Sequence, residues 1–155
     1  PESWRAYRKR IGWWGWPAPL KTSYEETVGT LFSAKGIQRE DKEAREKYYS
    51  EMCLLFGAPC LILACIPQKS AVEYALLDIG LVVQTICLLA HDKGLGTCIM
   101  AFSALYPDAV RKIASIPDDK RIVVGIALGY PDPAFPLNNF ARKRAEISEF
   151  VHWVK

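Results

Sequence analysis

Apolar residues are concentrated in the middle of the chain, in short runs separated by polar and turn-forming residues. Residues 59–66 form a continuous apolar run, which predicts a buried strand. Residues 121–128 form a second run of this kind and predict another buried strand. Residues 94–100 lead into a third strand. Helical patterns fill the gaps between the strands, which predicts an α/β or α+β fold with helices packed on a sheet.

The helices before the first strand are marked by caps and by charge spacing. Thr22 and Glu25 fit a capping box, which would open a helix that Lys35 and Gly36 close. A second helix is expected over residues 40–56, solvent-facing in its first half and apolar in its last turn.

The longest helix is expected between the first two strands. Ser70 and Glu73 fit another capping box, from which a helix of about twenty residues runs to Lys93-Gly94. It is apolar on nearly every face around Asp78 and Gln84, so it should be buried either centrally or in a subunit interface. Its charges argue against a membrane span.

The rest of the chain is dominated by proline and by a basic cluster. Pro107 suits the first turn of a short helix that runs to Ala114. Prolines at 131, 133 and 136 should hold residues 129–139 in an extended arm. A basic cluster follows at 142–144. The pattern contains no internal repeat and no domain boundary, which predicts a single domain over residues 1–155.

Composition narrows the class of protein. Half of the 155 residues are apolar and the formal net charge is +3, which is typical of a soluble globular domain and gives no reason to expect a nucleic-acid partner. The segment Pro1–Arg5 does not resemble a signal peptide. The odd number of cysteines, all in apolar surroundings and without CxxC spacing, predicts reduced core thiols in a cytoplasmic protein and no metal site. They are Cys53, Cys60, Cys65, Cys87 and Cys98.

The segment Gly94-Leu95-Gly96-Thr97-Cys98 is open to two interpretations. It lacks a third glycine and a Walker lysine, so its spacing favours a helix C-cap followed by entry into a strand. Alternatively, the glycines let the backbone approach a flat ligand such as a flavin, and the amides that follow would donate to its N5/O4 edge. Cys98 is interpreted as a buried structural thiol, because neither His91 nor His152 has a spacing that suits a catalytic base.

Arginine and tryptophan supply the other candidates. Arg142 and Arg144 are two residues apart, so on an extended segment they face the same side and suit a phosphate, although a solvated basic tail is the simpler interpretation of the residues alone. Trp13, Trp14 and Trp16 fit equally well a stacking cap over a planar substrate or the apolar anchor of a loop.

Several short motifs occur in an order and spacing that resemble the FMN-dependent nitroreductase family, and the resemblance covers roughly residues 36–154. They are the stretch from Asp78 to Ala90, Lys93-Gly-Leu-Gly-Thr-Cys, Tyr106-Pro-Asp-Ala-Val-Arg, Ile116-Pro-Asp-Asp, Val124-Gly-Ile-Ala-Leu-Gly-Tyr-Pro-Asp and Arg142-Lys-Arg, preceded by Gly36-Ile-Gln-Arg-Glu-Asp and Phe56-Gly-Ala-Pro.

The resemblance implies an α+β, three-layer fold, with an antiparallel-type sheet covered by helices, that forms an intertwined homodimer with one FMN at each of two subunit interfaces. The implied activity is an oxidoreductase that passes hydride from NADH or NADPH, through flavin N5, to a small nitroaromatic, quinone or similar electrophilic acceptor in a ping-pong cycle. No catalytic side chain is implied, because the flavin carries the hydride chemistry.

The same resemblance assigns roles to residues of this chain. The apolar helix over 71–90 would be the dimer-interface helix, and residues 129–155 would form an arm around the partner. The variable segment 1–21 would cover the flavin, with Trp13, Trp14 and Trp16 as a substrate lid. The isoalloxazine edge would lie along the backbone of Ile99, Met100, Ala101 and Phe102, and the FMN phosphate would bind Arg142 and Arg144.

The chain departs from the family pattern in two respects. The first helix with its Arg-Ser-x-Arg run has no counterpart, nor has the Asn-containing flavin loop, so we expect that N-terminal sequence is absent. Ala101 also stands where many relatives have Glu. These departures leave two alternatives open: a non-catalytic dimerising remnant of the family, or a flavin enzyme with a different reaction such as reductive dehalogenation.

Overall fold

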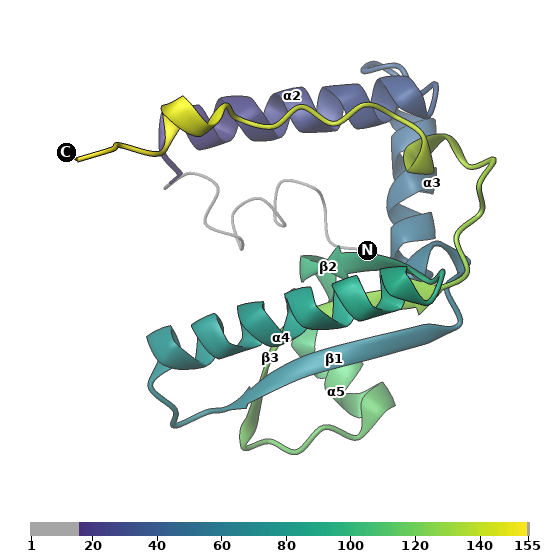
Figure 1. Cartoon of the computed structure of the whole chain (residues 1–155). Helices are drawn as coiled ribbons and strands as arrows, with labels where there is room; N and C mark the ends of the chain where they lie inside the picture. The colour runs from purple at the N-terminus through teal and green to yellow at the C-terminus, as the bar shows by residue number, and fades with distance from the viewer. Residues whose placement is uncertain (1–15, 155) are drawn as a thin grey trace. The chain divides into compact units, whose positions relative to one another are not determined.

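The computed structural model describes residues 16–154 (Figure 1). Their contacts divide the described chain into two compact units, each described by itself below. Residues 46–131 form the sheet unit, and residues 16–45 with 132–154 form the arm unit. Helix α3 (Lys42–Cys53) contributes residues to both units.

The sheet unit is built on three antiparallel strands. They are β1 (Cys60–Pro67), β2 (Gly96–Met100) and β3 (Lys120–Gly129), in the order β1-β3-β2. All three strands were expected from the apolar runs, and their positions are confirmed. Because β3 lies between the other two, Ile126 is fully buried at 0% exposure.

Helices lie on both sides of this sheet. Helix α4 (Val72–Asp92) contacts β1 and β2, and Figure 1 shows it on the side of the sheet opposite α5 (Pro107–Ala114). The 3-10 turn η3 (Ala101–Ala104) follows β2 directly and contacts β3. The α+β, three-layer prediction with an antiparallel sheet is therefore confirmed.

The predicted start of α4 is wrong in detail. Ser70 Oγ donates a 2.8 Å hydrogen bond to the carbonyl of Pro67, and Ala71 occupies the N-cap without a side-chain hydrogen bond. The hydroxyl therefore closes the turn that follows β1, so it is not available to cap the helix with Glu73.

Most of α4 is not buried in the single chain, contrary to the expectation of a helix covered on all sides. Only Val83 and Ala90 are buried. The helix is also long and apolar enough to cross a membrane, judged by length and composition only. A central position is thus wrong, and the alternative of an interface helix remains. Its exposed large apolar residues are Tyr74, Leu76, Leu77, Leu81, Val82, Leu88 and Leu89.

A Schellman motif ends α4 and leads into β2. Gly94 has a φ of 72°, its N–H donates to the carbonyl of His91 at 2.9 Å, and the N–H of Leu95 donates to Ala90 at 2.9 Å. The predicted C-cap is confirmed, and it places Gly96 at the first position of β2.

The arm unit begins with α2 (Ala18–Ala34), four residues earlier than Thr22. Pro17 occupies the N-cap and Pro19 lies in the first turn, where proline suits a helix because no amide donor is needed there. The capping box that we predicted at Thr22 is wrong, since both of its residues lie inside the helix. The predicted end is confirmed: Gly36 has a φ of 73°, and the N–H of Ile37 donates to Phe32 at 2.8 Å.

Helix α3 is shorter than the predicted span of 40–56. It is capped by Asp41, whose Oδ1 accepts the N–H of Ala44 at 2.9 Å. It ends at Cys53 because Leu55 and Phe56, in the turn η2 (Leu55–Gly57), have left-handed φ values of 58° and 53°.

The C-terminal segment runs back along α2 (Figure 1). The expected extended arm over 129–139 is wrong in part, because Pro136 opens a 3-10 turn, η4 (Pro136–Asn138); a second turn, η5 (Ile147–Glu149), follows. Lys35 Nζ lies 5.3 Å from the centroid of the Phe135 ring, which ties this segment to the end of α2.

The five cysteines all lie within residues 16–154, where they form no disulfide, and none is buried in the single chain. Cys53, Cys60 and Cys98 are exposed, and Cys65 and Cys87 are intermediate. The prediction of core thiols is therefore wrong for this chain. Within the described sheet, Cys60 and Cys98 lie on edge strands, and the outer face of α4 is exposed. Cysteines that are flanked by apolar residues in the sequence are therefore still accessible to solvent in the single chain.

Candidate functional site

The first part of the candidate site is the junction of β2 with η3. Ile99 and Met100 end the strand, and Ala101 and Phe102 open the turn. Ile99 is 54% exposed, whereas Met100 is 4% exposed. Alternate side chains thus point outward and into the core, while one backbone edge of β2 pairs with β3 and the other is unpaired in the described sheet. Free backbone groups beside a short turn suit the edge of a planar ligand.

The turn η3 packs against β3 and, near its C-terminal end, against α5. Gly125 pairs with Met100 across the sheet, and Ser103, only 4% exposed, lies directly over Gly125. The ring of Phe102 lies 4.9 Å from that of Tyr106, tilted by 48°. The side chain of Phe102 therefore packs within the sheet unit.

Helix α3 and η2 carry an aromatic cluster beside β2. The Tyr48 ring lies 5.7 Å from those of Tyr49 and Phe56. Burial raises the pKa of Tyr48 to about 12, and the nearby Cys98, Tyr49 and Glu51 act in the same direction. Tyr48 is thus a neutral phenol near the strand that leads into the candidate site. Sequence reasoning missed Tyr48, because its proximity to Cys98 depends on tertiary packing.

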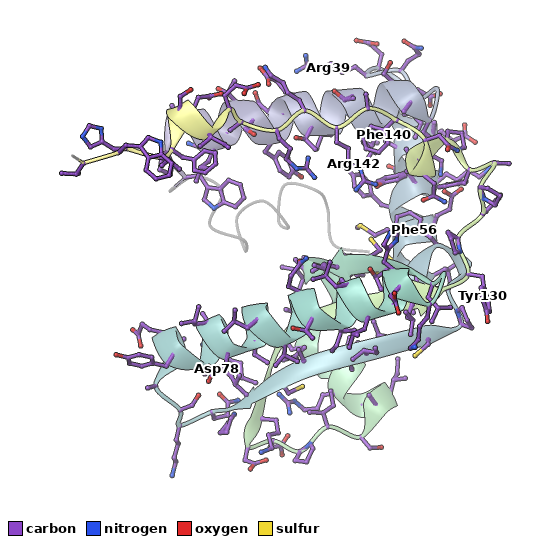
Figure 2. All side chains as sticks on the ribbon, viewed as in Figure 1. Arg39, Phe56, Asp78, Tyr130, Phe140 and Arg142 are labelled. Atoms are coloured by element: carbon purple, nitrogen blue, oxygen red, sulfur yellow. The ribbon has the colours of Figure 1, made fainter. Side chains whose placement is uncertain are left out.

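The second part of the candidate site lies in the arm unit. Arg142 and Arg144 are both exposed, and Figure 2 shows the labelled Arg142 and Phe140 on the segment beside α2. The Arg142 guanidinium lies 5.3 Å from the Phe140 ring centroid, and Arg144 Nη1 donates to the carbonyl of Lys143 at 3.1 Å. This segment and α2 line an open groove of about 1100 Å³.

A cation–π contact with Phe140 restrains Arg142, and both arginines line the groove. Glu26 and Glu149 also line the groove, so it is not uniformly basic. Two guanidinium groups that line one groove suit a phosphate.

The structure places the predicted lid only in part. Trp13 and Trp14 lie outside the described residues. Trp16 makes an edge-to-face contact with Tyr24 of α2, with ring centroids 6.2 Å apart and an interplanar angle of 90°.

The predicted site residues therefore fall in two groups. Residues 99–102 are contiguous in the sheet unit, and Arg142 and Arg144 lie together in the arm unit. Among residues 16–154, no group of three or more His, Cys, Asp or Glu side chains is arranged to hold a metal. Ser103 and Gly125 were also missed by sequence reasoning; the only signal was a glycine inside an apolar strand, which indicates close backbone approach.

Known proteins match this chain over most of its sequence. The sequence model of the nitroreductase family matches residues 20–130. A 4-nitrobenzoate reductase from Nocardioides sp. (strain LMS-CY) is 33% identical over 138 residues, which cover 88% of this chain and 56% of that protein. A chloronitrobenzene nitroreductase from Comamonas testosteroni is 29% identical over 88% of this chain and 60% of its own length.

Solved structures of FMN-dependent nitroreductases share this fold. The FMN and NADPH-dependent nitroreductase NfnB from Sphigopyxis sp. strain HMH superposes with a TM-score of 0.85 at 26% identity, over 91% of this chain and 63% of that one. The chain thus spans less than two thirds of the length of these relatives. The shared fold extends over nearly all of the chain.

Proposed function

Because this chain belongs to the nitroreductase family, we propose that it functions as an FMN-dependent oxidoreductase that passes hydride from NADH or NADPH to an electrophilic acceptor. Nitroaromatic compounds and quinones are the proposed acceptors, in a ping-pong cycle. The observation that carries the proposal is the family match over residues 20–130, which includes most of the sheet unit and of α2. The names of the relatives, which include reductases of 4-nitrobenzoate and chloronitrobenzene, support the acceptor class.

The β2–η3 junction is the proposed contact with the flavin ring. When bound, FMN supplies the hydride chemistry at N5. None of residues 99–102 is ionisable, so this segment offers backbone groups to the ring edge and no side-chain acid or base. The buried Met100 side chain anchors the strand end, which keeps the backbone groups of Ala101 and Phe102 in place.

Arg142 and Arg144 are the proposed phosphate ligands. Both side chains line an open groove, a guanidinium group can bind a phosphate through two hydrogen bonds, and the Phe140 ring restrains the Arg142 guanidinium. Each unit, taken by itself, therefore offers groups that fit one part of FMN: backbone groups of residues 99–102 for the ring, and the guanidinium groups of Arg142 and Arg144 for the phosphate.

We propose that a second copy of the chain covers α4. Seven large side chains of this helix are exposed, which is more apolar surface than a monomer normally leaves in water. We further propose that the protein is a cytoplasmic homodimer. Its proposed partners are small molecules, and neither membrane nor nucleic acid is among them. Residues 1–155 would act as one nitroreductase-like domain, in which segment 1–21, with Trp13, Trp14 and Trp16, is the proposed substrate lid and residues 129–155 the arm.

One experiment tests the central proposal. The purified protein is incubated with FMN, freed of unbound flavin and assayed for NADH and NADPH oxidation with 4-nitrobenzoate and with a quinone. We expect a yellow protein that consumes nicotinamide in the presence of either acceptor. A protein that remains colourless would contradict the proposal and would favour a non-catalytic dimerising role. A flavin-loaded protein that reduces neither acceptor would favour a different flavin reaction.

A further inference from the structure

We propose that Ser103 and Gly125 form a lock that positions the β2–η3 backbone against the flavin ring. The inference rests on the proposed FMN site, and it assigns a positioning role to two residues that do not themselves belong to that site. It is carried by the close approach of η3 to the central strand β3.

The approach leaves no room for a side chain at position 125. A Cβ on Gly125 would lie 2.2 Å from Ser103 Oγ, 2.9 Å from Ser103 Cβ and 2.9 Å from Leu61 Cδ1. All three distances are well below the van der Waals separation of carbon and oxygen atoms, so the added methyl group would clash with each of these atoms. Gly125 is buried on the central strand, so the strand itself is poorly placed to give way.

The three contacts differ in how easily they are relieved. Rotation of the Ser103 side chain moves Oγ, and rotation of Leu61 moves Cδ1. The Cβ of Ser103 is attached directly to the backbone of η3, so only a shift of the turn relieves that contact. A methyl group at position 125 therefore acts on the backbone of η3.

The shift would fall on the proposed flavin edge. Met100 pairs with Gly125 across the sheet, and Ala101 and Phe102 lie between Met100 and Ser103. At its other end η3 is held by Leu105, which is 6% exposed, and by the contact of Phe102 with Tyr106. With both ends anchored, a displaced Ser103 must change the direction of the amides at 101 and 102.

The test compares four variants of the FMN-loaded protein. Gly125→Ala introduces the methyl group, Gly125→Ala with Ser103→Ala removes Oγ, and Gly125→Ala with Ser103→Gly removes both Ser103 atoms. Val124→Ala is the matched control: it shortens the residue of β3 that directly precedes Gly125, whose side chain projects from the opposite face of the sheet. Each protein is measured for FMN dissociation constant, shape of the visible flavin absorption band, and melting temperature.

We expect Gly125→Ala to raise the FMN dissociation constant about tenfold, the effect of losing one hydrogen bond, and to change the absorption band. The Ser103→Gly double variant should regain the parent band and affinity, and the Ser103→Ala double variant should lie between them. Val124→Ala should lower the melting temperature while its band stays like that of the parent.

Three outcomes would overturn the inference. One is a folded Gly125→Ala protein with the band and affinity of the parent. Another is a change in Val124→Ala as large as in Gly125→Ala. If Gly125→Ala does not fold, the Ser103→Gly double variant decides, and its failure to recover the parent band rejects the lock. A parent protein that binds no FMN would instead reject the proposed function itself.

Discussion

Arg142 and Arg144 provide the sharpest residue-scale test of the cofactor site. Replacing either by Gln should raise the FMN dissociation constant at least tenfold, because a charge-assisted hydrogen bond to phosphate contributes about 1.5–3 kcal/mol. Fluorescence titration measures the change. Riboflavin, which lacks the phosphate, should bind parent and variants equally. Lys112→Gln, which removes an exposed positive charge from α5, is the matched control. An equal loss in that control would mean that general charge, and not a phosphate contact, attracts FMN.

The raised pKa of Tyr48 predicts that the stability of the folded chain depends on pH. Its pKa is raised from 10.0 to about 12 in the folded chain. The unfolded chain therefore releases this proton first, so the contribution of Tyr48 to stability is complete below pH 10 and is lost as the pH rises towards 12. Tyr48→Phe should lose less stability over this range than the parent, as measured by urea unfolding at several pH values. If the parent and Tyr48→Phe lost the same free energy of unfolding over this pH range, the result would contradict the burial of the Tyr48 hydroxyl.

Single residues were predictable from the sequence only where local spacing or the family resemblance singled them out. Residues 99–102 and the two arginines were identified in this way. The roles of Tyr48, Ser103 and Gly125 depend on contacts between segments that are distant in the chain, and a spacing pattern carries no information about them.

At the scale of elements, the glycine C-caps provide a direct test. Gly94 has a φ of 72° and open space around its missing side chain, so Gly94→Ala should destabilise the protein through backbone strain alone, by about 1 kcal/mol. Gly29→Ala, inside α2 and also in open space, should instead stabilise it by about 0.5–1 kcal/mol. Chemical denaturation measures both. Equal effects of the two substitutions would contradict the Schellman motif.

Helix ends proved easier to predict than helix starts. A left-handed C′ residue strongly favours glycine, so Gly36 and Gly94 marked their helix ends correctly. Serine and threonine have several local partners, and Ser70 bonds to the turn before α4 instead of capping the helix. Proline opened α2 ahead of the expected threonine.

At the scale of the whole molecule, the alternation of apolar runs with helical patterns was sufficient to predict an α+β fold. Strand order was not predictable in this way, because β3 enters between the two earlier strands. Burial of α4 was also mispredicted. An apolar helix is covered by something, but the sequence does not specify whether the cover belongs to the same chain.

The last prediction concerns the surface that buries the exposed apolar face of α4. Leu77, Leu81 and Leu88 are 60%, 62% and 59% exposed in the single chain, at spacings that place them near one another along the helix. If a second copy buries this surface, Leu81→Glu places an unpaired carboxylate in the interface and should raise the dimer dissociation constant by more than tenfold. Its monomer should still fold, because position 81 is exposed without a partner.

Sedimentation velocity on the parent and on Leu81→Glu measures the change, and circular dichroism checks that the helices persist. Ala109→Glu, an exposed alanine of α5, adds the same charge away from α4 and should remain dimeric. A parent protein that is monomeric at micromolar concentration would contradict the proposed homodimer. Partition of the parent into the membrane fraction would mean that lipid, and not a second copy, covers the apolar side chains of α4.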